Sequence, residues 1–509
     1  MMPNASLSPP AQAICDLRRR VTVALSLLLL MLYPHSGALG LGSAPLFLAC
    51  VYAFFRMGST LRIQPASSLG FSQDALGERP LLRTLVIVLA VLQVLRLPGD
   101  ALHAETSRLP HSLLAIWLAG VGLWATRRER AASPAASRAL AAVCVLSAGT
   151  VFAYLLLHAP SPRIDVFELQ QRGAALVWSG QNPYSALYPN PYDPVETTAF
   201  FGHYSATLDH YPYPPLSLLL TALAHRLTHD VRWLFLLSHL LIGWALHRLS
   251  QRVQKAQPSS FDRGLVLLCI HLLHPRGFLV IEQAWTEPLV AGAISLWALF
   301  RAQLSQRLEP EAPRLASRVW VVADSLLLGL AIACKQYGLL LLVPFLFPSL
   351  FAWTSPAWLS AQRRRAFLLA LLPLVVSYLA FAVVQPADFV EDVLLFQIKQ
   401  PFRSDALSLP ALFYAVSDVK LPGAVAAIGI LLPLSLVWRK RPPGLPAGLP
   451  GQLVLASLLL FGFFATAKQA FCNYYYLVGV LLLLTLAQLD EAADAEASDT
   501  PSRRPPLAS

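Results

Sequence analysis

Apolar windows of roughly 15–20 residues recur from one end of this chain to the other, and each could form a helix that crosses most of a bilayer's hydrocarbon core. The windows predict helices near residues 21–36, 40–55, 81–97, 111–126, 139–158, 231–248, 263–274, 286–300, 320–334, 338–353, 366–384, 421–438, 452–467 and 474–489. We therefore expect an all-α polytopic membrane protein built as a bundle of about 14 transmembrane helices.

Polar segments interrupt this pattern at three places. Residues 1–15 are predicted to form a disordered cytoplasmic N-terminus, and the acidic residues 490–509 a disordered cytoplasmic tail. The longest interruption, about 161–230, is predicted to be an outer loop that carries interfacial helices. Its segment 214–228 is short, starts with two prolines and contains His225 and Arg226, so we expect it to lie along the interface or re-enter without crossing.

Charge sets the expected orientation. The 509 residues are 56% hydrophobic and 13% charged, and the net charge of +11 comes from short basic clusters between apolar spans. This is the positive-inside pattern of membrane proteins, and it argues against nucleic-acid binding. Placing the clusters in the cytoplasm puts the N-terminus inside and Asp165 outside. Arg18 to Arg20 precede an apolar run without an evident cleavage site, which favours an uncleaved first helix.

Several classes of protein lack support. No P-loop or dinucleotide-binding turn occurs, which argues against a nucleotide-driven pump, and the absence of an internal repeat disfavours a transporter of two related halves. The six cysteines are scattered through mostly apolar runs and are predicted to be small buried residues.

Asp165 is the first candidate for chemistry. It follows the span that ends near Leu157 and opens the outer loop, at a boundary where carboxylates are costly and tend to be functional. A carboxylate there could take the proton of an acceptor hydroxyl as general base. A helix-end cap is the alternative role for Asp165. Glu168 is predicted to form a surface ion pair with Arg172.

Isolated cations are the second candidates. Lys335, Arg403 and Lys468 would lie on the outer side within apolar surroundings, where a cation is expected to face a cavity and meet an anion. Two lysines and an arginine suit a lipid-linked phosphate. Snorkelling of these side chains to the headgroups is the alternative.

The other polar and aromatic residues of the outer side carry weaker signals. Glu282 is predicted to line the cavity and contact sugar hydroxyls. The outer tyrosines are predicted to anchor the interface, with one or two stacking on sugar. Four side chains of the outer loop could hold a divalent metal: His203, His210, Asp193 and Asp209. Their spacing is not diagnostic of a metal site, so neither a metal nor another cofactor is predicted.

The order of these motifs resembles a known family. An aspartate just outside a helix, then Gly173, Leu176 and Gly180-x-Asn182-Pro183-Tyr184, then Tyr211-x-Tyr213-Pro214-Pro215-Leu216, resembles the GT-C superfamily of polyprenyl-phosphate-sugar glycosyltransferases. Glycosyltransferase family 87, the alpha-mannosyltransferase-like group, is the most similar. Glu282-Gln283, Lys335, residues 400–405 and residues 471–475 look like its other outer landmarks. The resemblance implies a GT-C-like catalytic membrane domain at 131–489, with additional N-terminal transmembrane helices at 16–130.

The resemblance also implies a reaction. The expected activity is inverting transfer of a sugar, mannose or another hexose, from a polyprenyl-phosphate donor to a lipid or glycan acceptor on the outer face of the membrane. Asp165 maps onto the family's acidic motif as catalytic base, and Lys335 and Arg403 fall where phosphate contacts are expected. Gln283, Tyr184, Glu282 and Lys468 complete the predicted substrate-binding set. Because Val166-Phe167-Glu168 follow Asp165 where a second acid would stand, a metal-dependent variant is less secure.

Two rival functions remain open at this point. A carrier or flippase would move a lipid-linked glycan between leaflets, and a glycan ligase or polymerase would use a diphosphate-linked donor. With no organelle address in the chain, we expect a multi-pass protein of a bacterial inner (plasma) membrane, with its active site on the extracytoplasmic, periplasmic side.

Overall fold

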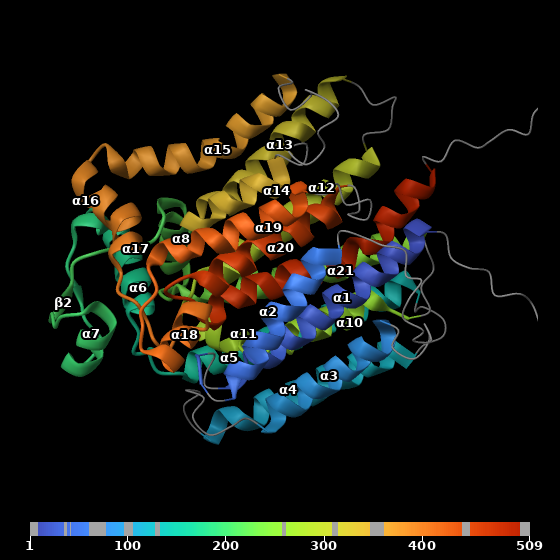
Figure 1. Ribbon diagram of the computed structural model, residues 1–509, viewed down its shortest axis with the longest axis horizontal. Helices are drawn as coiled ribbons and strands as arrows, with labels where there is room; N and C mark the ends of the chain where they lie inside the picture. Colours follow the sequence, from blue (N-terminus) through green and yellow to red (C-terminus); the bar gives the residue numbers. More distant parts are fainter. Residues whose placement is uncertain are drawn as a thin grey trace, which may run out of the picture.

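The computed structural model describes residues 9–34, 38–40, 42–60, 78–95, 105–127, 133–256, 261–307, 314–346, 361–439 and 448–498. Most of these residues are helical, and the long helices run along the longest axis of the molecule (Figure 1). The elements longer than eight residues are α1 (Pro9–Met31), α2 (Ser43–Thr60), α3 (Glu78–Leu95), α4 (Glu105–Arg127), α5 (Pro134–His158), α6 (Asp165–Trp178), α8 (Pro215–Thr228), α9 (Arg232–Ala256), α10 (Arg263–Leu272), α12 (Glu287–Arg307), α13 (Arg314–Ala333), α15 (Ala361–Ala382), α18 (Leu409–Ser417), α19 (Ala426–Arg439), α20 (Leu449–Thr466) and α21 (Cys472–Ser498).

Short elements connect the long helices. They are η2 (Pro183–Ser185), β1 (Tyr188–Pro189), α7 (Pro194–Phe201), β2 (Thr207–Leu208), α11 (Gly277–Glu282), η3 (Gln336–Leu341), α14 (Leu342–Leu346), α16 (Pro386–Val390), the π-helical turn η6 (Glu391–Leu395), α17 (Phe396–Lys399) and η7 (Gly423–Val425).

Among the residues that the structure describes, five helical segments are long and apolar enough to cross a membrane by length and composition. They are Arg108–Arg127, Pro134–His158, Arg365–Ala382, Leu449–Thr466 and Cys472–Leu489. Other predicted spans are shorter: α10 has 10 residues, about 15 Å at 1.5 Å per residue, which is half of the hydrocarbon core. The five segments identify an integral membrane protein, whereas the predicted count of about 14 crossings is not confirmed.

Described residues of several basic clusters gather at one end of the bundle. Glu78 at the start of α3 pairs with Arg18 of α1 at 3.4 Å and with Arg263 at the start of α10 at 2.9 Å. Arg20 donates to the backbone of Arg56 in α2. The start of α1 and the end of α21 lie at this same end, and the segment around α6 and α7 lies at the other (Figure 1). The two ends that the charge pattern predicted are therefore separate in the fold; which of them faces the cytoplasm remains a prediction.

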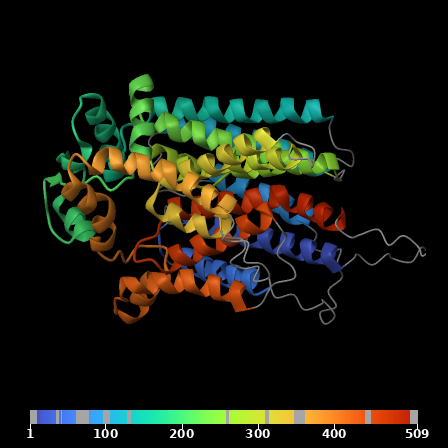
Figure 2. The ribbon, with the colours of Figure 1, turned by 90° about the horizontal axis from the view of Figure 1, so that it is seen from above.

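The opposite end carries the predicted outer loop. There α6 packs on α8 and contacts β1, which pairs with β2 in a two-residue antiparallel ribbon, and α7, α16 and α17 lie at the same end of the molecule (Figure 2). The 14-residue α8 packs on α6, and the Trp178 indole of α6 donates to the Ala222 carbonyl of α8 at 2.6 Å. This placement agrees with the prediction that 214–228 does not cross.

Two apolar cores hold these parts together. The larger runs without a break from α1 to α21, so the predicted additional helices at 16–130 share one core with the predicted catalytic domain. The smaller lies in the outer segment and is rich in tyrosine: Leu169, Tyr184, Tyr188, Leu208, Tyr211, Tyr213, Leu218, Phe389 and Val393. Four of the tyrosines predicted as interface anchors are thus core residues, because several segments of the outer loop fold over them. Cys50, Cys144, Cys269, Cys334 and Cys472 are buried, as predicted.

The two chain ends need a correction. The helix α1 begins at Pro9, inside the predicted disordered segment 1–15, and α21 continues to Ser498, inside the predicted tail 490–509. Both stretches contain alanine and other good helix formers, so they extend a neighbouring helix even where they have no apolar face to bury. Residues 1–8 and 499–509 lie outside the described residues.

Candidate active site

A cavity of about 360 Å³ opens at the α6 end of the bundle. Segments far apart in sequence meet around it: the start of α6, the turn before α12, the residue before η3, and the two stretches 400–405 and 469–474. Four of the predicted site residues line this one cavity: Asp165, Gln283, Lys335 and Arg403. The landmark residues Phe471 to Tyr474 line it as well.

Asp165 sits at the first turn of α6, after Ile164 in extended conformation. Its Oδ1 accepts hydrogen bonds from the Tyr192 hydroxyl at 2.8 Å and from the Val166 amide at 2.8 Å, and the Asp165 amide donates to the same hydroxyl at 3.2 Å. Within the described part of the chain Oδ2 has no hydrogen-bond partner. The carboxylate is therefore fixed through one oxygen while the other is available to a ligand in the cavity.

The Tyr192 hydroxyl holds the Asp165 carboxylate in this position. Tyr192 is not among the candidate site residues predicted from the sequence. Burial, helped by the neighbouring Asp165 carboxylate, raises the pKa of the Tyr192 phenol, so the phenol stays protonated and donates. Its ring packs edge-on against Phe200 of α7, with the centroids 4.8 Å apart. In the sequence Tyr192 is one of several outer tyrosines, and only the turn residues around it, Asn190-Pro191 and Asp193-Pro194, single it out.

Lys335 approaches the cavity from the end of α13. Its Nζ donates to Thr286 Oγ1 at 2.8 Å, lies 3.4 Å from the fully buried Glu287 carboxylate, and lies 5.1 Å from the centre of the Tyr213 ring. The ammonium is thus held in place by an acid and a hydroxyl behind it. The structure thus places Lys335 at the cavity lining, and its binding of a phosphate stays a prediction.

Arg403 has a different environment from the one predicted. Its guanidinium forms a two-pronged ion pair with Asp405, with both hydrogen bonds at 2.8 Å, and lies over the rings of Phe200 at 4.0 Å and Phe471 at 5.0 Å. The fork that was predicted to bind phosphate is occupied by a carboxylate of the same turn. Both partners of this ion pair line the cavity.

Three predicted substrate-binding residues do not line this cavity. Tyr184 is buried in the tyrosine core and donates its hydroxyl to the Tyr213 carbonyl at 2.9 Å. Glu282 is buried at the end of α11, while its neighbour Gln283 lines the cavity. The Lys468 ammonium donates to the carbonyls of Ile398 and Gln400, which ties residues 398–400 to the loop before α21.

Of the four residues considered for a metal, Asp193, Asp209 and His210 have other contacts, and His203 is exposed. Asp193 caps α7 together with Glu196, and both carboxylates pair with Arg163. Asp209 bonds to His210, with 3.3 Å between Oδ1 and Nδ1. In the described ranges no group of three or more His, Cys, Asp or Glu side chains is placed to hold a metal ion. As predicted, Glu168 pairs with Arg172 on the surface of α6.

Comparison with known proteins gives structural neighbours only. No family model matches the chain, and no curated protein matches it. The chain is similar to the crystal structure of ArnT from Cupriavidus metallidurans bound to undecaprenyl phosphate, with 18% identity and a TM-score of 0.45, over 70% of this chain and 60% of ArnT. The apo structure of the same protein gives 18% identity and a TM-score of 0.43, over 68% of this chain and 59% of ArnT. The chain spans about three fifths of ArnT, and membership of family 87 remains a prediction.

The cavity lining contains charged side chains of both signs. Its lining holds three cations, Arg163, Lys335 and Arg403, against two carboxylates, Asp165 and Asp405. Each of these cations also has a carboxylate partner, Glu196, Glu287 and Asp405 respectively, so the site offers cations held in place and not a free positive excess. An unpaired carboxylate oxygen next to such a site is the combination needed to accept a proton close to a bound phosphate.

Proposed function

We propose that this chain is an integral membrane glycosyltransferase that transfers a hexose from a polyprenyl-phosphate donor to a hydroxyl of a lipid or glycan acceptor. The observation that carries the proposal is the meeting of Asp165 and Lys335 at one cavity, although 170 positions separate them in the chain. The cavity lies at the end of the bundle opposite the basic clusters, which by the positive-inside rule is the extracytoplasmic end.

The chemistry follows from the placement of the charged groups. The acceptor oxygen forms a bond to the anomeric carbon while the bond from that carbon to the phosphate oxygen breaks, and the bonding electron pair leaves with the polyprenyl phosphate. The acceptor proton passes to Asp165 Oδ2, the oxygen that Tyr192 leaves free. A single displacement from the face opposite the leaving group inverts the anomeric configuration.

Lys335 is the proposed phosphate contact. Its ammonium is held by Thr286 and Glu287, and it does not have to reorganise as charge develops on the departing phosphate. Arg403 has its fork on Asp405, so we assign it mainly the ordering of Phe200 and Phe471 on the cavity wall. Gln283 is the remaining predicted residue placed to contact the sugar.

The test is a transfer assay with the purified full-length chain. Polyprenyl-phosphate mannose carrying a radiolabel is supplied with a membrane lipid extract as the source of acceptors, first in detergent and then in liposomes. Asp165→Asn is expected to lower transfer at least about 100-fold while donor binding is kept. Lys335→Met is expected to weaken donor binding as well as transfer, and the exposed lysine variant Lys420→Met serves as control.

The same assay distinguishes the rival functions. Movement of labelled donor between leaflets without a new glycosidic bond would support a flippase and contradict the proposal. Transfer that requires a diphosphate-linked oligosaccharide would support a ligase or polymerase. Full transfer by Asp165→Asn would remove the base assignment.

A further inference from the structure

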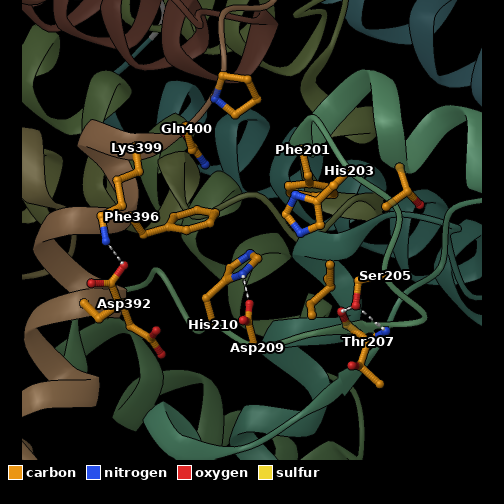
Figure 3. Close-up of a pocket in the computed structure, with 14 residues that line it drawn as sticks. Phe201, His203, Ser205, Thr207, Asp209, His210, Asp392, Phe396, Lys399 and Gln400 are labelled. Carbon is orange, nitrogen blue, oxygen red and sulfur yellow. Dashed lines mark hydrogen bonds and ion pairs between the residues drawn. The ribbon is translucent and has the colours of Figure 1, made fainter.

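A second cavity of about 240 Å³ lies beside the candidate active site (Figure 3). One wall is the stretch from the end of α7 to His210, and the other runs from the π-helical turn η6 to Pro401. The two cavities share three lining residues, Phe201, Phe396 and Gln400. The two cavities therefore adjoin at these three side chains.

The charged groups of the second cavity are mostly acidic. Its lining holds the carboxyl groups of Asp209, Glu391 and Asp392 against one lysine, Lys399. Lys399 pairs with Glu391 at 2.6 Å, and both are largely exposed. Since Glu391 neutralises Lys399, the described residues of the wall include acidic groups and no free cation, so the second cavity does not suit the anionic part of a lipid-linked donor.

His210 supplies an unused polar atom within this acidic wall. It is only 8% exposed, its ring stacks on Phe396 with the centroids 3.8 Å apart, and its Nδ1 faces Asp209. In the described part of the chain its Nε2 has no hydrogen-bond partner. Figure 3 shows the ring projecting into the space bounded by Phe396, Phe201 and His203. Burial lowers the pKa of His210, so the ring is neutral, and with Nδ1 donating to Asp209 its Nε2 can accept a hydroxyl proton.

We propose that the second cavity binds a neutral sugar ring of the acceptor. Carboxylates and a neutral histidine accept hydrogen bonds from sugar hydroxyls, and the rings of Phe201 and Phe396 offer apolar faces to the C–H side of the sugar. The cavity is smaller than the about 300–1,000 Å³ of sites for drug-sized ligands, which suits one ring better than a long glycan. The role of this cavity as an acceptor subsite rests on the proposed transferase function, whereas the binding of a sugar ring in it does not depend on that function.

The binding test uses defined probes. The purified full-length chain, in a detergent without a sugar headgroup, is titrated with methyl glycosides of mannose, glucose and galactose, and with inorganic phosphate, by calorimetry. At least one glycoside is expected to bind and phosphate is not expected to compete with it. His210→Gln and Asp209→Asn are expected to weaken glycoside binding about tenfold, the effect of losing roughly 1.4 kcal/mol.

The matched control is Tyr204→Ala. Tyr204 is exposed on the same stretch as His203 and does not line the cavity. Binding of none of the three glycosides, competition by phosphate, or equal weakening in Tyr204→Ala would overturn the proposal. His203→Ala, at an exposed position of the wall, gives a second readout if His210→Gln does not fold, and it too is expected to weaken binding.

The inference and the proposed function fail in different ways. Asp165→Asn is expected to lose transfer but to bind the glycoside as the wild type does. If the chain binds the glycoside but transfers no sugar from polyprenyl-phosphate mannose, the proposed transferase function is wrong and the proposed sugar site stands. If the enzyme transfers sugar but Asp209→Asn and His203→Ala do not change the KM for the acceptor, the second cavity is not an acceptor subsite, and the proposed transferase function stands.

Discussion

At the scale of single residues, the site is organised by the contacts of its charged groups. Asp165 is fixed by Tyr192, Lys335 by Thr286 and Glu287, and Arg403 by Asp405. Because each charged side chain has a partner behind it, little has to move when substrate enters. Such preorganisation is where most electrostatic catalysis originates.

Tyr192→Phe isolates one of these contacts. The variant keeps the ring that packs on Phe200 but loses the hydroxyl that bonds to Asp165 Oδ1. We expect kcat to fall about 10- to 100-fold, because a small misplacement of a catalytic group has effects of this size, with donor affinity unchanged. Steady-state kinetics and donor binding measure the two quantities.

Tyr188→Phe is the control for that experiment. The Tyr188 hydroxyl donates to the Pro183 carbonyl inside the tyrosine core and does not reach the cavity. Its loss is expected to affect stability more than kcat. A wild-type kcat in Tyr192→Phe would show that the hydroxyl does not position the carboxylate.

At the scale of elements, the outer segment depends on close packing of α6 against the tyrosine core. Gly173 of α6 lies under the Tyr211 ring, and a Cβ added there would stand 2.5 Å from Tyr211 Cε2. Tyr211 in turn donates its hydroxyl to Gln170 of the same helix at 3.0 Å. The glycine is thus required by the approach of a buried ring and not by backbone conformation.

Gly173→Ala is expected to destabilise the protein by about 1–3 kcal/mol, the usual cost of overpacking a core, despite the better helix propensity of alanine. Thermal unfolding in detergent measures the change. Ala175→Ser, at an exposed position of α6, is expected to have a much smaller effect. Equal stability of Gly173→Ala and the wild type would mean that α6 and Tyr211 can separate freely.

The segment of α16, η6 and α17 carries a buried acid that couples stability to pH. Burial raises the pKa of Asp392 to about 7, while its Oδ2 accepts a hydrogen bond from the Tyr211 amide at 2.7 Å. The folded state holds this proton more tightly than the unfolded state. The free energy of unfolding therefore falls as pH rises from about 4, the unfolded pKa of an aspartate, to about 7.

Asp392→Asn removes that dependence and keeps an acceptor for the Tyr211 amide. Between pH 5 and pH 8 the variant is expected to lose less thermal stability than the wild type. Asp418→Asn is the control, since Asp418 is exposed and has a positive φ of 55° that asparagine tolerates. The same pH dependence in Asp392→Asn and the wild type would contradict the assignment to this carboxyl.

At the scale of the whole molecule, the fold has two chemically different ends. Ion pairs of arginine with Glu78 gather the starts of α1, α3 and α10 at one end, and both cavities lie at the other. The helices at 16–130 are part of this arrangement, because Ala38 lines the first cavity and the Leu39 amide donates to the Asp405 carbonyl at 2.9 Å. They help to build the candidate site.

Orientation in the membrane can be tested with one cysteine at each end. Tyr204→Cys places a thiol at an exposed position near the cavities, and Ala135→Cys places one near the start of α5. A membrane-impermeant thiol reagent is expected to label the first variant in intact cells and the second only after permeabilisation. Labelling is measured against the unmodified chain, and the reverse pattern would place the cavities in the cytoplasm.

The sequence by itself determined the helical membrane class, the position of most long helices, the two ends of the bundle, and four residues of the candidate site. These features depend on local hydrophobicity and on charges beside apolar spans, which act within a few residues of where they occur. Of the short motif Glu282-Gln283, Gln283 lines the candidate cavity and Glu282 does not.

Only the tertiary structure decided which of the candidate side chains face the cavity. Tyr184 and Lys468 have the same residue types as real lining groups, yet one is enclosed by the tyrosine core and the other by backbone carbonyls. Three further features were likewise not predicted from the sequence. These are the ion pair of Arg403 with Asp405, the hydrogen bond from Tyr192 to Asp165, and the second cavity around His210. Apart from Asp405, which stands two residues from Arg403, the partners of these side chains come from chain segments tens to hundreds of residues away, and those segments meet only when the molecule folds.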